Sequence, residues 1–324
     1  MNRIFIWTLI LWIAHYPVFG LGQNVECDSL IAQYWNAQDS TAINLAISVS
    51  GHPSLALNDT AIFYAKEAIR RSVQSNYISG HIEGLLELSK HYLDRKDQAQ
   101  SKRNINTALE LASTSKDSFL IYKSMRLLAW HYYVFDDYPT SLSYYLKMIP
   151  HCQAINLYEC LVVAMMNAGT IYTKMDGYED SKNYDEANRL FHQLIAMASA
   201  KNDSTVIVQA AVNLSGNYRQ ASHPDSAIIY AQKAYDISKA MQFPLGTIKS
   251  SSLLAMNHLD AGRFEAAEQY ADKIINSGTT DLQSLGLAHK YKAAASDSLN
   301  RSGEAFKHAN KSLAINEIIG SGPY

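Results

Sequence analysis

A block of about forty residues recurs along most of this 324-residue chain, and no other feature constrains the fold as strongly. The segments 59–68 (DTAIFYAKEA) and 225–234 (DSAIIYAQKA) share six of ten residues. The small residue at the third position of this block returns at steps of 40, 40, 46, 40, 40 and 38 residues. Its positions are Ala61, Ser101, Ser141, Ala187, Ala227, Ala267 and Ala305. A step of 40 that holds four times indicates a repeat array.

Each block has the spacing of an amphipathic helix, because positions i, i+4, i+7 and i+8 are apolar or small. A second periodic segment precedes each block and carries an aromatic column. Its members are Tyr92, Tyr132, Tyr172, Tyr218 and His258. We therefore predict an all-α chain of helix pairs, in which each pair stacks on the next to bury its apolar stripe. The tyrosines are expected to fill the space between one pair and the next.

The first 22 residues differ from the rest of the chain. Arg3 precedes an almost wholly apolar run from Ile4 to Phe19, and small residues follow at Gly20 and Gly22. This layout is typical of a secretory signal peptide, which we expect to be cleaved after Gly22. The alternative is an uncleaved membrane anchor, but the run is shorter than the roughly 20 residues that a spanning helix needs. The mature chain is thus predicted to be secreted or periplasmic.

The remaining chain divides by its patterns into three parts. Residues 23–57 are predicted to form an N-terminal helical cap with a degenerate first repeat, residues 58–319 the repeat array, and residues 320–324 a disordered tail. The one step of 46 adds six residues within 175–183. Insertions in repeat arrays fall in turns, so this one is a tolerated surface insertion, an extension of a helix or a loop presented to a partner.

Composition excludes several classes of partner. The formal net charge is −2 and hydrophobic residues make up 48% of the chain, so neither nucleic acid nor an anionic membrane surface is indicated. No second apolar run of membrane-spanning length follows residue 22. Of the three cysteines, Cys152 and Cys160 lie eight residues apart and could form a disulfide; buried free thiols are the alternative.

The helix pairs resemble the tetratricopeptide repeat. The residues that carry the match are Leu254, Ala255, His258, Gly262, Phe264 and Ala267 in one unit, and Leu128, Ala129, Tyr132, Tyr138 and Ser141 in another. The family repeat has about 34 residues, so units of about 40 should contain longer helices. The resemblance implies a right-handed α-α superhelix of about six to seven helix pairs. The last unit departs from the pattern at Lys292 and Ser296.

This resemblance also implies a function. Ligands of such arrays are usually extended peptides or partner helices that lie in a groove lined by the first helix of each pair. The chain is therefore expected to be an extracytoplasmic scaffold that binds a protein or peptide. Arrays with long repeats also resemble the sensor arms of bacterial signalling proteins. The alternative is thus a sensor arm of the histidine kinase or transcriptional regulator type that lacks its output domain, or a truncated form of such a protein.

The expected groove wall is the first-helix face opposite the buried column. In one unit this face holds Lys123, Arg126, Trp130 and Tyr133, where two cations beside two aromatic rings suit a carboxylate or an aromatic group. Residues from neighbouring units that are expected to join them are Arg219 and Lys249, with Glu83, Lys90 and Gln220 beside them. The alternative is a solvated face with Trp130 packed between repeats.

Catalysis finds little support in the sequence. No His-Glu-x-x-His, Gly-rich phosphate loop or Gly-x-Ser-x-Gly motif occurs, and we predict no enzyme activity, no cofactor and no metal site. A hydrolase with a helical toroid fold would need paired carboxylates, for which Glu159, Asp176 and Asp185 are not suitably spaced. At the C-terminal end, Leu313 and Ile315 lack a helix to cover them, so a homodimer or a partner contact is expected through this last repeat.

Overall fold

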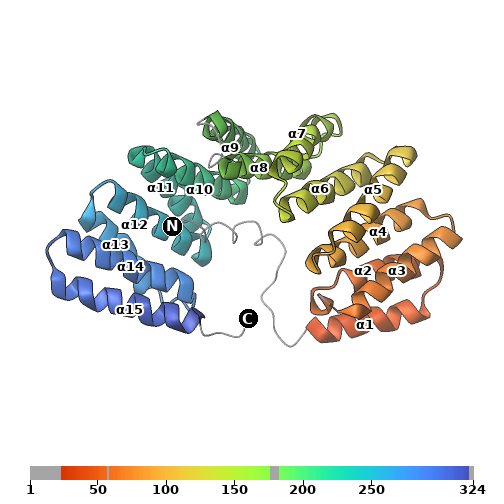
Figure 1. Cartoon of the computed structure of the whole chain (residues 1–324), viewed down its shortest axis with the longest axis horizontal. Helices are drawn as coiled ribbons and strands as arrows, with labels where there is room; N and C mark the ends of the chain where they lie inside the picture. Colours follow the sequence, from red (N-terminus) through yellow and green to blue (C-terminus); the bar gives the residue numbers. More distant parts are fainter. Residues whose placement is uncertain (1–22, 57, 176–181, 321–324) are drawn as a thin grey trace. The chain divides into compact units, whose positions relative to one another are not determined.

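The computed structural model describes residues 23–56, 58–175 and 182–320, and every regular element within these ranges is helical (Figure 1). The predicted signal peptide, residues 176–181 of the insertion and residues 321–324 of the tail lie outside the described residues. The helices are α1 Gln23–Asn36, α2 Asp39–Ser50, the 3-10 helix η1 Pro53–Leu55, α3 Asp59–Gln74, α4 Ile78–Asp94, α5 Gln98–Ser115, α6 Ser118–Val134, α7 Tyr138–Ala154, α8 Tyr158–Met175, α9 Lys182–Ala200, α10 Ser204–Gln220, α11 Pro224–Ala240, α12 Pro244–Asp260, α13 Phe264–Ile275, α14 Leu282–Ser298 and α15 Ser302–Gly320.

The helices follow the predicted pairs. Seven pairs run from α2/α3 to α14/α15 through the described residues, so α2 supplies a first helix for the block at Ala61, and α1 precedes it. The chain divides into two compact units, residues 1–160 (unit 1) and 161–324 (unit 2). In unit 1 the first helices α2, α4 and α6 contact one another in turn, and in unit 2 the first helices α10, α12 and α14 do the same.

A residue with left-handed backbone conformation recurs every twenty residues and sets the length of the helices. These residues have φ between 50 and 71° and are Asn76, Lys96, Lys116, Asp136 and Asn156 in unit 1, and Asn202, Ser222, Gln242 and Gly262 in unit 2. The forty-residue repeat therefore consists of two similar halves, each a helix and a short turn. Helices α4, α6, α10 and α12 have 17 residues each, which accounts for a repeat longer than 34 residues.

Each turn closes one helix and begins the next with the same few residues. In the turn between α4 and α5, the Asp97 backbone N–H donates to the Tyr92 carbonyl at 2.8 Å, the six-to-one bond of a Schellman motif. The Asp97 carboxylate then accepts a hydrogen bond from the Gln100 N–H at 3.1 Å and caps α5. Asp117, Asp137 and Asp203 act in the same double way. Both halves of the repeat are thus defined by local hydrogen bonds.

The small-residue column lies where two helices approach most closely. Its seven members are all buried, from Ala61 to Ala305. Ser141 keeps its hydroxyl satisfied there by donating to the Ala129 carbonyl at 2.7 Å. Gly169 in α8 shows how tight such contacts are, because a Cβ atom there would lie 2.7 Å from the ring of Phe191. A larger side chain in this column would force the helices apart.

The aromatic column contacts the preceding pair, as the sequence suggested, and in three pairs it also stacks within its own pair. Tyr132 of α6 packs against the core cluster that α4, α5 and α6 share, and the Lys102 ammonium group of α5 lies 5.1 Å from the centroid of its ring. The rings of Tyr132 and Tyr144 are stacked at 5.7 Å, and those of Tyr218 and Tyr230 at 5.5 Å. His258 stacks on Tyr270 at 5.6 Å in the same way. The partner lies twelve residues after the column residue each time, since a helix end, a turn and a helix start bring the two rings face to face.

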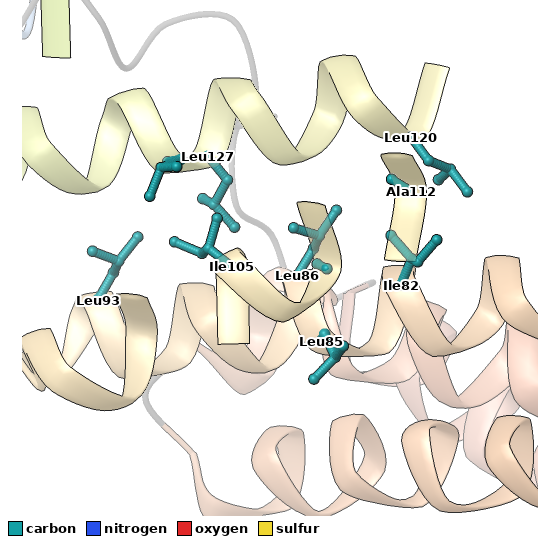
Figure 2. Close-up of a cluster of buried hydrophobic side chains, with 10 residues drawn as sticks. Ile82, Leu85, Leu86, Leu93, Ile105, Ala112, Leu120 and Leu127 are labelled. Carbon is teal, nitrogen blue, oxygen red and sulfur yellow. The ribbon is translucent and has the colours of Figure 1, made fainter. Parts of the chain in front are cut away.

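Apolar side chains from consecutive pairs share one core. Figure 2 shows a cluster in unit 1 that contains Ile82, Leu86 and Leu93 of α4, Ile105 of α5, and Leu127 of α6. Since the cluster joins one pair to the first helix of the next, no pair buries its apolar stripe alone. Burial of each such side chain contributes roughly 1.5–3 kcal/mol, so a truncation here would destabilise both neighbouring pairs.

Polar contacts join positions that lie about one repeat apart. Arg95 pairs with Asp59 at 2.6 Å in unit 1, and Arg263 pairs with Asp225 at 2.5 Å in unit 2. The last pair, despite its departures from the repeat pattern, is held similarly. Lys292 contacts Asp272 at 2.6 Å, and the Ser296 hydroxyl donates to Glu268 at 2.6 Å.

Replacing Lys116 by glycine should stabilise the protein. Lys116 adopts φ 58° and ψ 25°, a conformation that costs a residue with a Cβ about 1–2 kcal/mol and glycine almost nothing. Part of this gain is offset by the greater freedom of glycine in the unfolded chain, so we expect about 0.5–1 kcal/mol. Urea unfolding followed by circular dichroism would measure it. Lys116→Ala, which removes the same charge but keeps the Cβ, should show no gain; an equal gain would contradict the backbone explanation.

Candidate functional site

The six residues predicted to line a groove are divided between the two units. Lys123, Arg126, Trp130 and Tyr133 all lie on α6 in unit 1. Arg219 lies on α10 and Lys249 on α12, both in unit 2. In unit 1 the relevant surface is the α4–α6 face, which we define by Glu83, Glu87, Lys90, Lys123, Arg126, Trp130 and Tyr133. In unit 2 it is the α12 stripe, which we define by Lys249, Ser252, Met256 and Asp260.

On the α4–α6 face, Lys123 is already paired. Its Nζ lies 2.5 Å from Glu83 Oε1, on the equivalent position of the preceding repeat, and about a third of each side chain is exposed. The same ammonium group lies 5.0 Å from the centroid of the Phe119 ring. Lys90 likewise pairs with Glu87 at 2.6 Å. The Lys123–Glu83 pair therefore joins α6 to α4, whereas the Lys90–Glu87 pair lies within α4, and both lysine charges are neutralised before any ligand arrives.

Arg126 has a different environment. Its guanidinium group lies 5.7 Å from the centroid of the Tyr122 ring, and no acidic side chain in the described part of the chain forms an ion pair with it. Burial raises the pKa of the nearby Tyr145 phenol, which stays neutral and gives Arg126 no counter-charge. A guanidinium group that rests on an aromatic ring keeps its donors available for a carboxylate or a backbone carbonyl.

Trp130 and Tyr133 form an aromatic pair one turn farther along α6. Their rings are stacked at 5.1 Å with an interplanar angle of 17°. Trp130 is half-buried and packs against the core cluster of unit 1, so it serves packing as well as exposing part of its indole ring. Tyr133 is also half-buried and lies 5.6 Å from Tyr138. The pair therefore offers a fixed, partly exposed aromatic surface next to Arg126.

In unit 2 the two predicted cations differ in the same way as those of unit 1. Arg219 pairs with Asp260 at 3.1 Å, which joins the ends of α10 and α12. Lys249 is half-buried, and burial lowers the pKa of its ammonium group. Asp281 partly opposes that shift, but no ion pair to Lys249 forms within the described ranges. Gln220 accepts a hydrogen bond from the Tyr184 hydroxyl at 2.5 Å and helps to join α9 to α10.

The buried histidines have structural partners. His91 bonds to Ser50 at 3.0 Å, and His131 to Ser101 at 3.1 Å, in both cases between helices. His289 and His308 share a hydrogen bond of 2.8 Å between their Nδ1 atoms, and burial lowers the pKa of His289 to about 4. Both rings are therefore neutral at neutral pH. Over residues 23–56, 58–175 and 182–320, no group of three or more His, Cys, Asp or Glu side chains is arranged to hold a metal ion.

Two further features bear on the environment of the protein. Cys152 at the end of α7 and Cys160 in α8 are joined as a disulfide with their Cα atoms 5.4 Å apart, and Cys27 is a buried free thiol. On α15, Phe306 is 70% exposed and Leu313 is 62% exposed. None of the described helices combines the length and the apolar character that crossing a bilayer requires.

The repeat geometry recurs in proteins of known structure. A signal transduction ATPase with numerous domains (STAND) from Pyrococcus horikoshii, which has a tetratricopeptide repeat sensor, aligns with a TM-score of 0.65 and 13% identity over 92% of this chain. The alignment spans only 48% of that protein. The fold is that of a tetratricopeptide-like helical solenoid.

Two regulators have the same tetratricopeptide-like fold over most of their length. The quorum sensor NprR from B. thuringiensis in its apo form aligns with a TM-score of 0.59 and 16% identity, over 90% of this chain and 81% of that one. A Rap protein in complex with competence and sporulation factor aligns with a TM-score of 0.54 and 13% identity, over 92% and 80% of the two chains. No protein family model matches the sequence, and no curated protein does. At these identities the likeness concerns the fold alone.

Sequence reasoning placed the tetratricopeptide-like helices correctly but could not distinguish paired from unpaired cations on them. The sequence does hold a sign of this difference, in the residue that lies one repeat before each cation. Lys123 and Lys249 occupy the same column, and the residue one repeat earlier is Glu83 in the first case and Gln209 in the second. Tyr291, which no column singled out, donates to the Met256 sulfur at 3.5 Å and covers the middle of the α12 stripe.

Proposed function

We propose that this chain is an extracytoplasmic scaffold that binds a protein or peptide through the first-helix faces of its repeats and has no catalytic chemistry of its own. The observation that carries the proposal is the α4–α6 face, where Arg126 and the stacked Trp130–Tyr133 pair stay partly exposed. Partly exposed aromatic rings beside an available guanidinium group are the residue types that dominate protein-binding hot spots.

The structural relatives favour the same kind of activity. One of them is a quorum sensor, and another was solved in complex with competence and sporulation factor. A third is described as having a tetratricopeptide repeat sensor. That description also favours the alternative role, in which this chain is the sensor arm of a bacterial signalling system and its output lies on another polypeptide. Both roles require ligand binding on the repeats, and they differ in what the bound state controls.

Removal of the α4–α6 anchors should abolish partner capture. The mature chain, immobilised through an affinity tag, is incubated with an extracytoplasmic extract, and retained proteins are identified by mass spectrometry. The double variant Arg126→Gln/Trp130→Ala should retain at least ten-fold less partner than the wild-type chain. The reason is that each hot-spot residue contributes about 2 kcal/mol or more to binding. The matched control is Lys66→Gln/Phe63→Ala, which removes an exposed cation and an exposed ring from α3 of the same unit. Unchanged capture by a folded Arg126→Gln/Trp130→Ala chain would remove this face from the site.

An extracytoplasmic location is supported by the layout of residues 1–22 and by the Cys152–Cys160 pairing, because disulfides persist in oxidising compartments. Protein recovered from its native compartment should start at Gln23 and have an intact mass lower than the reduced chain by two hydrogens. Denaturing alkylation should then modify Cys27 alone. A chain that retains residues 1–22, or that is alkylated at all three cysteines, would contradict this proposal.

A second copy of the chain is the proposed partner of the α15 surface. Phe306 and Leu313 occupy the columns of Ile62 and Ile69, which pack against the next pair in unit 1. The same columns on α15 are open to solvent, so two such surfaces could bury each other. Light scattering after size-exclusion chromatography should give a dimer for the wild-type chain and a monomer for Phe306→Glu/Leu313→Glu. A wild-type monomer at high concentration would contradict the contact.

A further inference from the structure

The two lysines of one repeat column differ in a way that indicates a ligand. Lys123 and Lys249 are equivalent by the repeat, and each is half-buried on a first helix. Glu83, one repeat before Lys123, neutralises it at 2.5 Å. The residue one repeat before Lys249 is Gln209, whose amide carries no charge. The array thus keeps the cation at this column of unit 2 but not its anionic partner.

The surroundings of Lys249 do not replace that partner. Lys249 is half-buried, so water solvates its ammonium group incompletely. Within the described residues, Asp281 is the acidic group that influences it, and the Asp281 carboxylate is engaged with its own helix. That carboxylate accepts hydrogen bonds from the Gln283 N–H at 3.2 Å and from the Ser284 hydroxyl at 2.5 Å. A partly desolvated cation without an ion-pair partner gains most from a carboxylate that arrives with a ligand.

The rest of the α12 stripe determines what kind of ligand would fit. Lys249, Ser252, Met256 and Asp260 follow at i, i+3, i+7 and i+11, so they share one side of the helix over about 16 Å. The Tyr291 hydroxyl contacts the Met256 sulfur at 3.5 Å, and burial raises the pKa of this phenol, which stays neutral. At the far end Arg219 neutralises Asp260 at 3.1 Å. The stripe therefore has one available charge, at Lys249, followed by a neutral surface of a thioether and a phenol ring.

We propose that Lys249 binds a carboxylate of the ligand, with an apolar side chain of the same ligand resting on Met256 and Tyr291. The proposal rests on the function proposed above and adds the ligand's chemistry: an acidic group followed by an apolar one. The carboxylate can belong to an Asp or Glu side chain or to the free C-terminus of a peptide. None of the described acidic groups forms an ion pair with Lys249, so none of them has to be displaced for either to bind.

A peptide selection tests this assignment. The mature, full-length chain is immobilised and incubated with a pool of random octapeptides, prepared once with amidated and once with free C-termini, and retained peptides are sequenced. Wild-type protein should enrich Asp or Glu at one position next to an apolar residue. Enrichment in the amidated pool identifies a side-chain carboxylate, whereas enrichment confined to the free-acid pool identifies the terminal one.

Three variants separate the outcomes. Lys249→Gln should lower the acidic preference about ten-fold or more, because hydrogen bonds to charged groups contribute roughly 1.5–3 kcal/mol. Lys249→Glu should select Lys or Arg instead, which a merely structural lysine would not cause. Lys239→Gln removes an exposed cation from α11 of the same unit and should leave the preference unchanged.

The results distinguish a failure of the Lys249 assignment from a failure of the proposed peptide-binding function. Peptides retained without an acidic preference, or an acidic preference that survives in Lys249→Gln, overturn the assignment of Lys249 and leave the binding function standing. A folded wild-type chain that retains no peptide in preference to any other overturns the peptide-binding function, and the assignment of Lys249 with it. Circular dichroism of each variant establishes that a lost preference is not a lost fold.

Discussion

The turn that places a left-handed residue at every twentieth position is the constraint on which the rest depends. It closes one helix through a six-to-one hydrogen bond, and an aspartate at the next position often caps the following helix. Where the turns have the same length, from α3 to α8 and from α10 to α13, each helix begins forty residues or nearly so after the one two places earlier. Equivalent residues then recur at intervals of forty and meet equivalent neighbours. The buried small column, the stacked aromatic pairs and the polar contacts between repeats all follow from that equal spacing.

How much of this could be predicted from sequence depends on the kind of contact. The buried column from Ala61 to Ala305 was visible because helix packing at close approach tolerates only small residues. The stacking of Tyr132 on Tyr144 was missed because it depends on how two helices meet around a turn, which no single-helix periodicity contains. The left-handed residues were missed as well. Only Gly262 in this series has the expected glycine, while lysine, asparagine and serine occupy equivalent places.

The candidate site was harder to predict than the fold because charge pairing is a property of two repeats at once. Lys123 and Arg126 look alike in sequence, yet Glu83 neutralises the first and an aromatic ring supports the second. Trp130 packs against the core cluster of unit 1 and is still partly exposed. The two units consequently present different surfaces on the same scaffold: an aromatic and guanidinium surface on α6, and a single available ammonium group on α12.

The polar contacts between neighbouring repeats restrict which insertions and deletions such a chain can accept. Arg95 with Asp59, Arg263 with Asp225 and Asn257 with Ser215 connect residues 36, 38 and 42 apart, each close to one full repeat. Loss or duplication of one complete forty-residue module would keep equivalent repeat positions opposite one another. A change of any other size inside a helix would shift the contacts out of step along the remainder of that unit. Insertions and deletions in this kind of protein should therefore comprise whole repeats of about forty residues. Insertions or deletions of any other length should occur only in the turns.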